Sequence, residues 1–209
     1  RQMCIRDRNT GNIVIYKKSN DSVVETIDIT NTNIVSGSGT NKITINPSAE
    51  LESGTEYYVQ IDSSAFDDSS SNSFAGISDK TSLSFTSADV EAPTLSSTSP
   101  SDDSTNIAIN GDIELTFSEA VDVESGYLTI KKSSDDSEFE KIDVTSTQVS
   151  GTGTNVITIN PANTFASTTQ YYVQIDSTAF VDGSSNFFAG ILDKNSLNFT
   201  TEDISAPTL

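Results

Sequence analysis

The sequence has no histidine and no tryptophan, and it contains one cysteine and one methionine. Without histidine it cannot form a Ser-His-Asp or Cys-His catalytic site, an imidazole zinc site or a histidine pH switch. Positive charge is also scarce, because 11 Lys and Arg stand against 30 Asp and Glu in 209 residues, a formal net charge of −19. So acidic a chain repels phosphate at long range, which excludes an electropositive surface for nucleic acid.

Long apolar stretches are missing as well. No run of 18 apolar residues occurs, so we expect no membrane insertion in this segment. The first residues do not combine a charged region with an apolar one. We therefore expect any export signal to lie upstream of this sequence.

Residues 1–8 differ in composition from everything that follows. They contain Met3, Cys4 and all of the arginines, which are Arg1, Arg6 and Arg8. We interpret them as foreign sequence, such as a cloning scar or read-through of non-coding DNA, the alternative being a genuine basic N-terminal arm. Without them the chain has no cysteine and is still more acidic. That composition suits a location outside the cell, where disulfides are optional.

The remaining sequence repeats. Residues 36–95 match residues 150–209 without a gap, and residues 11–34 match residues 126–149 with a shift of one position. Residues 92–124 have no counterpart in the first copy. We therefore divide the chain into foreign residues 1–8, a truncated repeat at 9–91, a complete repeat at 92–205 and the start of a third repeat at 206–209. We expect it to be a window from a longer array, with neighbouring repeats of the same chain as partners.

Apolar and polar residues alternate within the complete repeat, which is typical of antiparallel strands with one face on a core. We expect strands around residues 113–117, 128–130, 142–144, 156–159, 171–175 and 197–199. Only residues 187–194 favour a short turn of helix. About seven strands in about 110 residues predict an all-β fold of tandem immunoglobulin-like or fibronectin-III-like antiparallel β-sandwiches. The first copy is truncated at its N-terminal end, and we expect a bare strand edge there.

A tyrosine begins one predicted strand in each copy. Tyr57 follows Leu51 by six positions, and Tyr171 follows Phe165 by six positions, each with a threonine two residues before the tyrosine. This spacing indicates a tyrosine corner, in which the phenol hydroxyl bonds back to the backbone and fixes the entry into the strand. Its recurrence in both copies supports the sandwich prediction.

Two segments carry a family resemblance. APTLSSTSPSDDSTNIAINGDIELTFSEAV at 92–121 and TTQYYVQIDSTAFVDGSSNFFAG at 168–190 resemble the bacterial Ig-like domain of the type found in the S-layer protein SbsA. The loop at 182–186 departs from the tighter D-x-x-G-N turn common in that family. The resemblance implies tandem modules in large exported or cell-surface bacterial proteins, including adhesins and S-layer proteins, and it implies no reaction.

Pairs of adjacent carboxylates are the only candidate catalytic groups in the sequence. The pairs are Asp67 with Asp68, Asp102 with Asp103, and Asp135 with Asp136. Each pair lies among serines in a predicted turn, where aspartate is favoured because its side chain bonds the backbone two residues on. A glycosidase would need two facing carboxyls with one pKa raised by burial, and these polar loops indicate none. We expect no enzyme.

Calcium is the one cofactor that the residues leave open, because the chain is rich in the hard oxygen ligands that calcium prefers. The candidates are a loop with Asp68 and Asn72, its repeat with Asp182 and Asn186, and the joint between the repeats with Asp89, Glu91, Asp102 and Asp103. Their spacing matches no EF-hand. The alternative is that these acids only solvate turns.

Prolines mark the same point in successive repeats, at Pro93 and Pro207. Proline fixes φ near −65° and lacks an N–H, so it suits a short, semi-rigid connection. Since all modules carry charge of the same sign, we expect neighbours to repel one another and the array to stay extended.

Three functions fit these features. The first is a non-catalytic structural spacer in an adhesin-like stalk of a bacterial cell-surface or secreted protein. The second is an Ig-like module that binds a host or matrix glycan or protein, with Tyr16, Tyr127 or Phe188 as candidate exposed aromatic contacts, although aromatics of this kind more often serve sandwich packing. The third is an accessory module of a secreted hydrolase. All three are extracellular.

Overall fold

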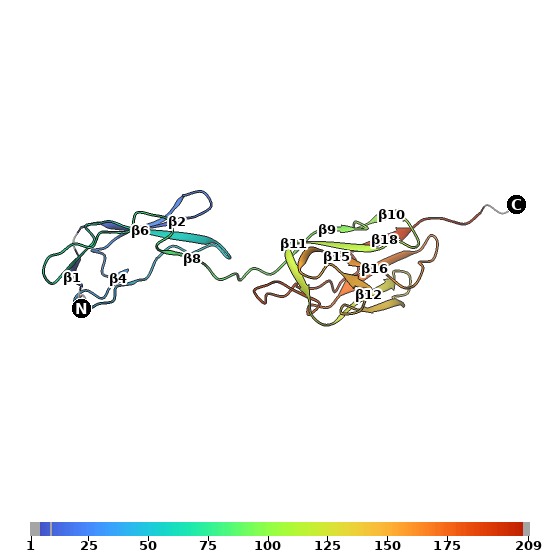
Figure 1. Cartoon of the computed structure of the whole chain (residues 1–209). Helices are drawn as coiled ribbons and strands as arrows, with labels where there is room; N and C mark the ends of the chain where they lie inside the picture. The colour runs from blue at the N-terminus through green and yellow to red at the C-terminus, as the bar shows by residue number, and fades with distance from the viewer. Residues whose placement is uncertain (1–4, 9, 207–209) are drawn as a thin grey trace. The chain divides into compact units, whose positions relative to one another are not determined.

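The computed structural model describes residues 5–8 and 10–206, which belong to two compact units, Arg1–Val90 and Glu91–Leu209 (Figure 1). All the regular elements in this part of the chain are β-strands, and the sheets are predominantly antiparallel. The prediction of two Ig-like β-sandwiches is therefore confirmed. No helix within the described ranges is long and apolar enough to cross a membrane.

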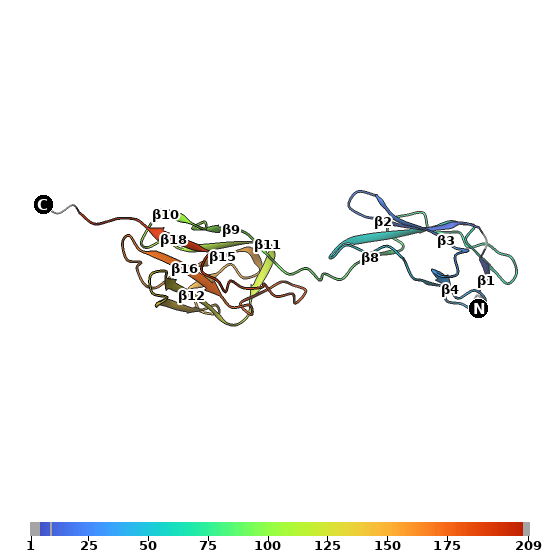
Figure 2. The same cartoon turned by 180° about the vertical axis from the view of Figure 1, so that it is seen from behind.

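Two sheets enclose the core of the second unit (Figure 2). One sheet has the order β10 (Ser104–Ile107), β18 (Asn198–Thr201), β16 (Gln170–Ile175), β12 (Tyr127–Lys132) and β13 (Glu138–Asp143). The other has the order β14 (Val149–Ser150), β15 (Thr154–Ile159), β11 (Ile113–Val123) and β17 (Phe180–Val181), with β9 (Leu95–Ser99) also paired to β11. The parallel pair β10 and β18 is the exception to the antiparallel pattern.

Strand β11 is central to that core. Its Ile113, Leu115 and Phe117 are buried, as their alternation with polar residues predicts. Ile113 lies opposite Ile159 of β15, and Leu115 lies opposite Ile157. Burying each of these side chains stabilises the fold by about 1.5–3 kcal/mol.

The first unit contains fewer strands. Its main sheet has the order β3 (Val23–Asp28), β2 (Asn12–Lys17), β6 (Glu56–Ile61) and β8 (Ser84–Thr86). Two short pairs complete it, β4 (Val35–Ser36) with β5 (Thr44–Ile45), and β1 (Ile5–Arg8) with β7 (Phe66–Asp68). Its buried core is smaller than that of the second unit and is centred on Ile13, Ile27 and Tyr57.

The truncation of the first unit affects both of its sheets. In the part of the chain that the structure describes, nothing corresponds to β9, β10 or residues 113–119 of β11. The counterpart of the six-residue β15 is β5, which has two residues. The parallel partner that β10 gives to β18 has no equivalent beside β8 in the described sheet. In the described sheet, β8 therefore pairs with β6 alone.

Strand β1 replaces the end of β11. Arg8 pairs with Phe66 just as Val123 pairs with Phe180 in the second unit. Residues 5–8 thus form a strand although we interpret residues 1–8 as foreign, and residues 1–4 lie outside the described residues. Their foreign origin remains a prediction.

The expectation of a helical turn at residues 187–194 is wrong. Phe187 and Ile191 form antiparallel bridges with Val181 and Ile175 instead. Gly190 lies between them with φ +79°, and a Cβ there would lie 2.5 Å from the carbonyl oxygen of Ile175. Only glycine fits at this close approach to β16.

Candidate functional site

A tyrosine hydroxyl fixes the entry into β6 and β16. In the first unit the hydroxyl of Tyr57 accepts a hydrogen bond of 2.8 Å from the backbone N–H of Glu52. In the second unit the hydroxyl of Tyr171 accepts one of 2.9 Å from the backbone N–H of Ala166. Both rings are buried. This is the geometry of a tyrosine corner, and it gives both tyrosines a structural role.

An aspartate and an asparagine close the loop that follows β17. Asp182 is buried, and its Oδ1 accepts hydrogen bonds from the backbone N–H groups of Ser184 at 2.8 Å and Asn186 at 2.7 Å. Its Oδ2 accepts one from the side-chain amide of Asn186 at 2.8 Å. The structure therefore brings Asp182 and Asn186 together as acceptor and donor.

The same loop recurs after β7. Oδ1 of Asp68 accepts hydrogen bonds of 2.8 Å from the backbone N–H groups of Ser70 and Asn72. Its Oδ2 accepts one of 2.9 Å from the side-chain amide of Asn72. The asparagine again turns its amide N–H toward the carboxylate, so both copies use the pair to hold the loop closed.

Hydrogen bonds keep both carboxylates ionised. Burial acts to raise the pKa of Asp182, but the bonds from Asn186, Ser184 and Ser185 outweigh it and the pKa is lowered. The side chain and the backbone of Asn72 likewise lower the pKa of Asp68. Calcium takes 6–8 oxygen ligands at about 2.3–2.6 Å, and in both loops the asparagine turns its amide N–H, and not its oxygen, toward the carboxylate.

The acids expected at the joint have separate local partners. In the first unit Oδ1 of Asp89 accepts a hydrogen bond of 2.9 Å from the hydroxyl of Ser53. In the second unit Asn198 donates from its backbone and its side chain to Asp102 at 2.9 and 2.8 Å, and from its side chain to Asp103 at 3.0 Å. Glu91 is exposed at the start of the second unit. Asp102 and Asp103 thus tie the residues before β10 to β18.

Pro93 is buried where the second unit begins. The next residue, Thr94, donates its N–H to the hydroxyl of Ser118 at 3.0 Å and accepts the N–H of Ser118 at 2.8 Å. The chain is therefore fixed to β11 directly after this proline. Pro207 lies outside the described residues.

Glu140 is a buried acid that holds a loop in place, and the sequence-based candidates do not include it. Glu140 of β13 is buried, and its carboxylate accepts hydrogen bonds of 2.7–3.0 Å from Ala162, Asn163 and Gln148. Burial opposes ionisation of Glu140, but these bonds lower its pKa. Glu25 plays the same part in the first unit, toward Ser48 and Ala49. The sequence could have indicated that Glu140 is buried, because it lies two positions before the apolar Ile142 and so on the same face of β13.

An ion pair braces the hairpin between β12 and β13. Asp136 pairs with Lys194 and accepts a hydrogen bond of 3.1 Å from the hydroxyl of Tyr172. Asp21, Lys80 and Tyr58 repeat the arrangement in the first unit. Because these charges are about half exposed, solvent screens both pairs.

Hydrogen bonds stabilise the charged form of several carboxyl groups in both units. Hydrogen bonds or a neighbouring lysine lower the pKa of Asp21, Glu25, Asp28, Asp68, Asp79, Asp135, Asp136, Glu140, Asp143, Asp182, Asp193 and Asp203. The adjacent aspartates behave as turn residues, since Asp135 accepts from Ser137 while Asp136 pairs with Lys194. The shifts are opposite to those of a glycosidase.

The aromatic candidates have different surroundings. Tyr16 stacks on Tyr58 with ring centroids 4.9 Å apart, and Tyr127 is exposed with the Lys141 ammonium 4.0 Å from its ring centroid. The interpretation of Phe188 as an exposed contact is wrong, because Phe188 packs inside the core. Its neighbour Phe187 faces solvent instead.

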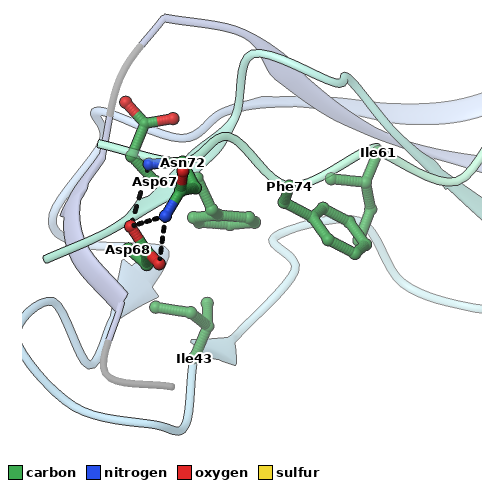
Figure 3. A pocket seen from close by; sticks show the side chains of 7 residues that line it. Ile43, Ile61, Asp67, Asp68, Asn72 and Phe74 are labelled. Atoms are coloured by element: carbon green, nitrogen blue, oxygen red, sulfur yellow. Dashed lines mark hydrogen bonds between the residues drawn. The ribbon is translucent and has the colours of Figure 1, made fainter. Parts of the chain in front are cut away.

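The first unit contains an apolar cavity of about 280 Å³. It is lined by Ile43, Ile61, Phe66, Asp67, Asp68, Asn72 and Phe74, so the closed Asp68–Asn72 loop forms one of its walls (Figure 3). Its isoleucines and phenylalanines come from the edge of β5, from β6 and from the segments around β7.

The sequence profile described as Bacterial Ig-like domain matches the chain twice, at residues 5–87 and 89–201. The chain belongs to the bacterial Ig-like domain family. The two matched ranges correspond to the two units, so this part of the protein consists of two Ig-like domains in tandem. No curated protein matches the chain significantly.

Two solved structures resemble these Ig-like domains. A crystal structure of the S-layer protein rSbsC has 16% identity and a TM-score of 0.35, and the match covers 56% of this chain and 14% of that one. The BSP domain of a biofilm associated protein has 14% identity and a TM-score of 0.28, with 96% of this chain and 26% of that one covered. The chain thus spans only a small part of either protein.

Proposed function

We propose that these tandem Ig-like domains are a non-catalytic structural spacer in the stalk of a bacterial cell-surface or secreted protein. One observation carries the proposal: the aspartate–asparagine loops and the tyrosine corners form their hydrogen bonds inside their own domain, at equivalent positions in both copies. Acidic side chains that stabilise their own domain fit a repeated module that bears a load or sets a distance between other domains.

The net charge of −19 supports an extended, soluble array outside the cell. Both domains are acidic, so they repel one another and other copies of the chain. Repulsion between exposed charges weakens with salt, because the Debye length is about 10 Å at 0.1 M ionic strength. An array built in this way should therefore contract as salt is added.

Insertion between an anchor and a reporter tests the spacer. The whole chain would be placed, in one, two or three tandem copies, between a membrane anchor and a reporter binding domain on a bacterial surface. We expect the height of the reporter to increase in equal steps while its affinity stays constant. A matched series carrying Leu115→Asp, which puts a charge into the core, should lose the regular steps.

A glycan and matrix-protein array probed with the whole chain separates a spacer from a binding module. We expect no retained ligand. The exposed Tyr127 beside Lys141 is the most suitable aromatic contact for a glycan. Saturable retention that Tyr127→Ala abolishes, with the fold intact, would replace the spacer by a binding module.

A further inference from the structure

Strands β10 and β18 come from opposite ends of the second domain's sequence and lie side by side. Strand β10 begins soon after the chain enters this domain, and β18 is the last of its described strands. The two are paired in parallel, with Ser104 opposite Phe199 and Ile107 opposite Thr201 (Figure 1). The segments through which the chain enters and leaves the domain are therefore joined directly to each other.

The parallel direction decides how a pull on the chain acts on this pair. A pull on the two chain ends draws β10 toward its own N-terminal end and β18 toward its C-terminal end. In parallel strands these directions are opposite, so the strands must slide past each other and their hydrogen bonds carry the load together. In an antiparallel hairpin pulled apart at its paired ends, the bonds break one after another instead. The β10–β18 pair is therefore loaded in shear, which resists a pull better than peeling does.

Side chains lock the pair at the end where β18 begins. Asn198 is only 6% exposed, and its backbone and side-chain N–H groups donate to Oδ1 of Asp102 at 2.9 and 2.8 Å. Its side chain also donates to Oδ1 of Asp103 at 3.0 Å. These three residues, which we call the clasp, connect the turn before β10 to the first residue of β18. Their hydrogen bonds cross the interface that a pull would shear.

Further hydrogen bonds hold the opposite end of the pair. The N–H of Glu202 donates to the carbonyl oxygen of Ile107 at 2.8 Å, and the N–H of Ile109 donates to Oε1 of Glu202 at 3.3 Å. The hydroxyl of Thr201 accepts the N–H of Thr169 at 2.9 Å, and the N–H of Thr201 donates to the carbonyl oxygen of Thr169 at 3.1 Å. The pair is therefore closed at both ends and anchored beside β16.

We propose that β10 and β18, together with the clasp, form a mechanical clamp that sets the force at which the second domain unfolds when the chain is pulled by its ends. Hydrogen bonds to charged groups are roughly twice as strong as neutral ones. Asn198 is buried, so water competes poorly for its amide. Rupture of this pair is the step that limits forced unfolding, which depends on the unfolding rate and not on equilibrium stability. The clamp deepens the spacer proposal and rests on it only for its biological purpose.

Stretching the whole chain between a surface and a force probe tests the clamp. The two domains lie in series along the chain, so both carry the same force. Unfolding of the second domain releases residues 93–203, a contour length of about 370–400 Å at about 3.3–3.6 Å per residue. Residues 10–88 of the first domain release about 260–280 Å on the same basis. The length of each step therefore assigns each event to its domain.

Matched variants separate the clamp from general stability. Asn198→Ser installs the residue found at the equivalent Ser84 of the first copy and removes the amide. We expect it to speed unfolding of the second domain at a given force at least tenfold. Glu140→Gln is the control, because it weakens hydrogen bonds on β13, at the opposite edge of the same sheet. It should lower the stability to urea and leave the unfolding force unchanged.

A change in the direction of the pull gives a readout that needs no weakened clasp. Cysteines introduced by Ser125→Cys and Thr145→Cys, in a chain that carries Cys4→Ser, flank the paired ends of β12 and β13. At those ends Tyr127 lies opposite Asp143. Handles at the two cysteines peel the antiparallel hairpin. We expect the hairpin to yield at a clearly lower force than the second domain pulled by the chain ends.

Two results would overturn the clamp. One is unfolding of Asn198→Ser at the wild-type force, and the other is a hairpin that resists peeling as strongly as the domain resists a pull on its ends. The surface display of tandem copies tests the spacer separately, because reporter height does not depend on the unfolding force. A strong clamp in a chain that gives no regular steps in height would refute the spacer proposal and leave the clamp standing.

Discussion

Phe117 meets Phe188 nearly edge-on, with ring centroids 5.3 Å apart and ring planes at 84°. Aromatic pairs in this geometry contribute about 0.5–1.5 kcal/mol beyond the burial of their surface. The counterpart of Phe188 in the first domain is Phe74, which lines a cavity and is partly exposed. The same residue of the repeat therefore contributes differently to the stability of the two domains.

Truncation of these two phenylalanines should reveal that difference. Phe188→Ala removes a buried ring, and we expect it to lower the unfolding free energy of the second domain by about 3–5 kcal/mol. Phe74→Ala should lower that of the first domain by about 1 kcal/mol or less, since its ring has little packing to lose. Urea unfolding of the whole chain, followed by NMR signals of each domain, measures both values. Equal losses would contradict the prediction.

The tyrosine corner should depend on one hydroxyl. Tyr171→Phe keeps the ring but removes the acceptor of the Ala166 N–H, and we expect it to destabilise the second domain by about 1–2 kcal/mol. Tyr57→Phe should have a similar effect on the first domain through Glu52. Tyr127→Phe is the control, because that side chain is exposed. Thermal unfolding measures the three variants, and an effect of Tyr127→Phe as large as that of Tyr171→Phe would argue against the corner.

The buried Glu140 should make the second domain sensitive to acid. Its pKa is lowered in the folded domain, so its stabilisation is present above the ordinary value of about 4.3 and is lost as the pH falls through the lowered value. Glu140→Gln should reduce this acid dependence and cost about 1–3 kcal/mol at pH 7, because an amide group then faces N–H donors. Urea unfolding between pH 7 and pH 2.5 measures the slope. Glu138→Gln, at an exposed position of the same strand, should leave the slope unchanged.

Periodicity was sufficient to predict the sandwich. The alternation of Ile113, Leu115 and Phe117 with polar residues identifies the inward face of β11, and the structure buries all three. The fold class depends on these local patterns of apolar and polar residues, and a single sequence is enough to identify them.

The hydrogen bonds of buried polar groups and the conformation of the loops were harder to predict from the sequence. Alternation places Glu140 on the inward face of β13, but only the folded loop supplies the N–H donors of Ala162 and Asn163 that stabilise its charge there. At residues 187–194 the composition favours a helical turn, and the close approach of Gly190 to β16 overrides it. Contacts between residues distant in sequence decide both outcomes.

The hydrogen bonds of the loop after β17, between Asp182 and Asn186, lead to a prediction about calcium. Asn186 turns its amide N–H toward Asp182, so the closed loop does not present the asparagine oxygen as a second ligand, and we expect millimolar calcium, added after chelation, to leave the melting temperature unchanged. Asn186→Asp replaces the donor amide by a second carboxylate, and the repulsion should lower the melting temperature until calcium restores it. Asn72→Asp should behave alike in the first domain. Calorimetry with and without calcium measures the shifts. A calcium-dependent rise in the wild-type chain that Asp182→Asn abolishes would show instead that the native loop is a calcium site.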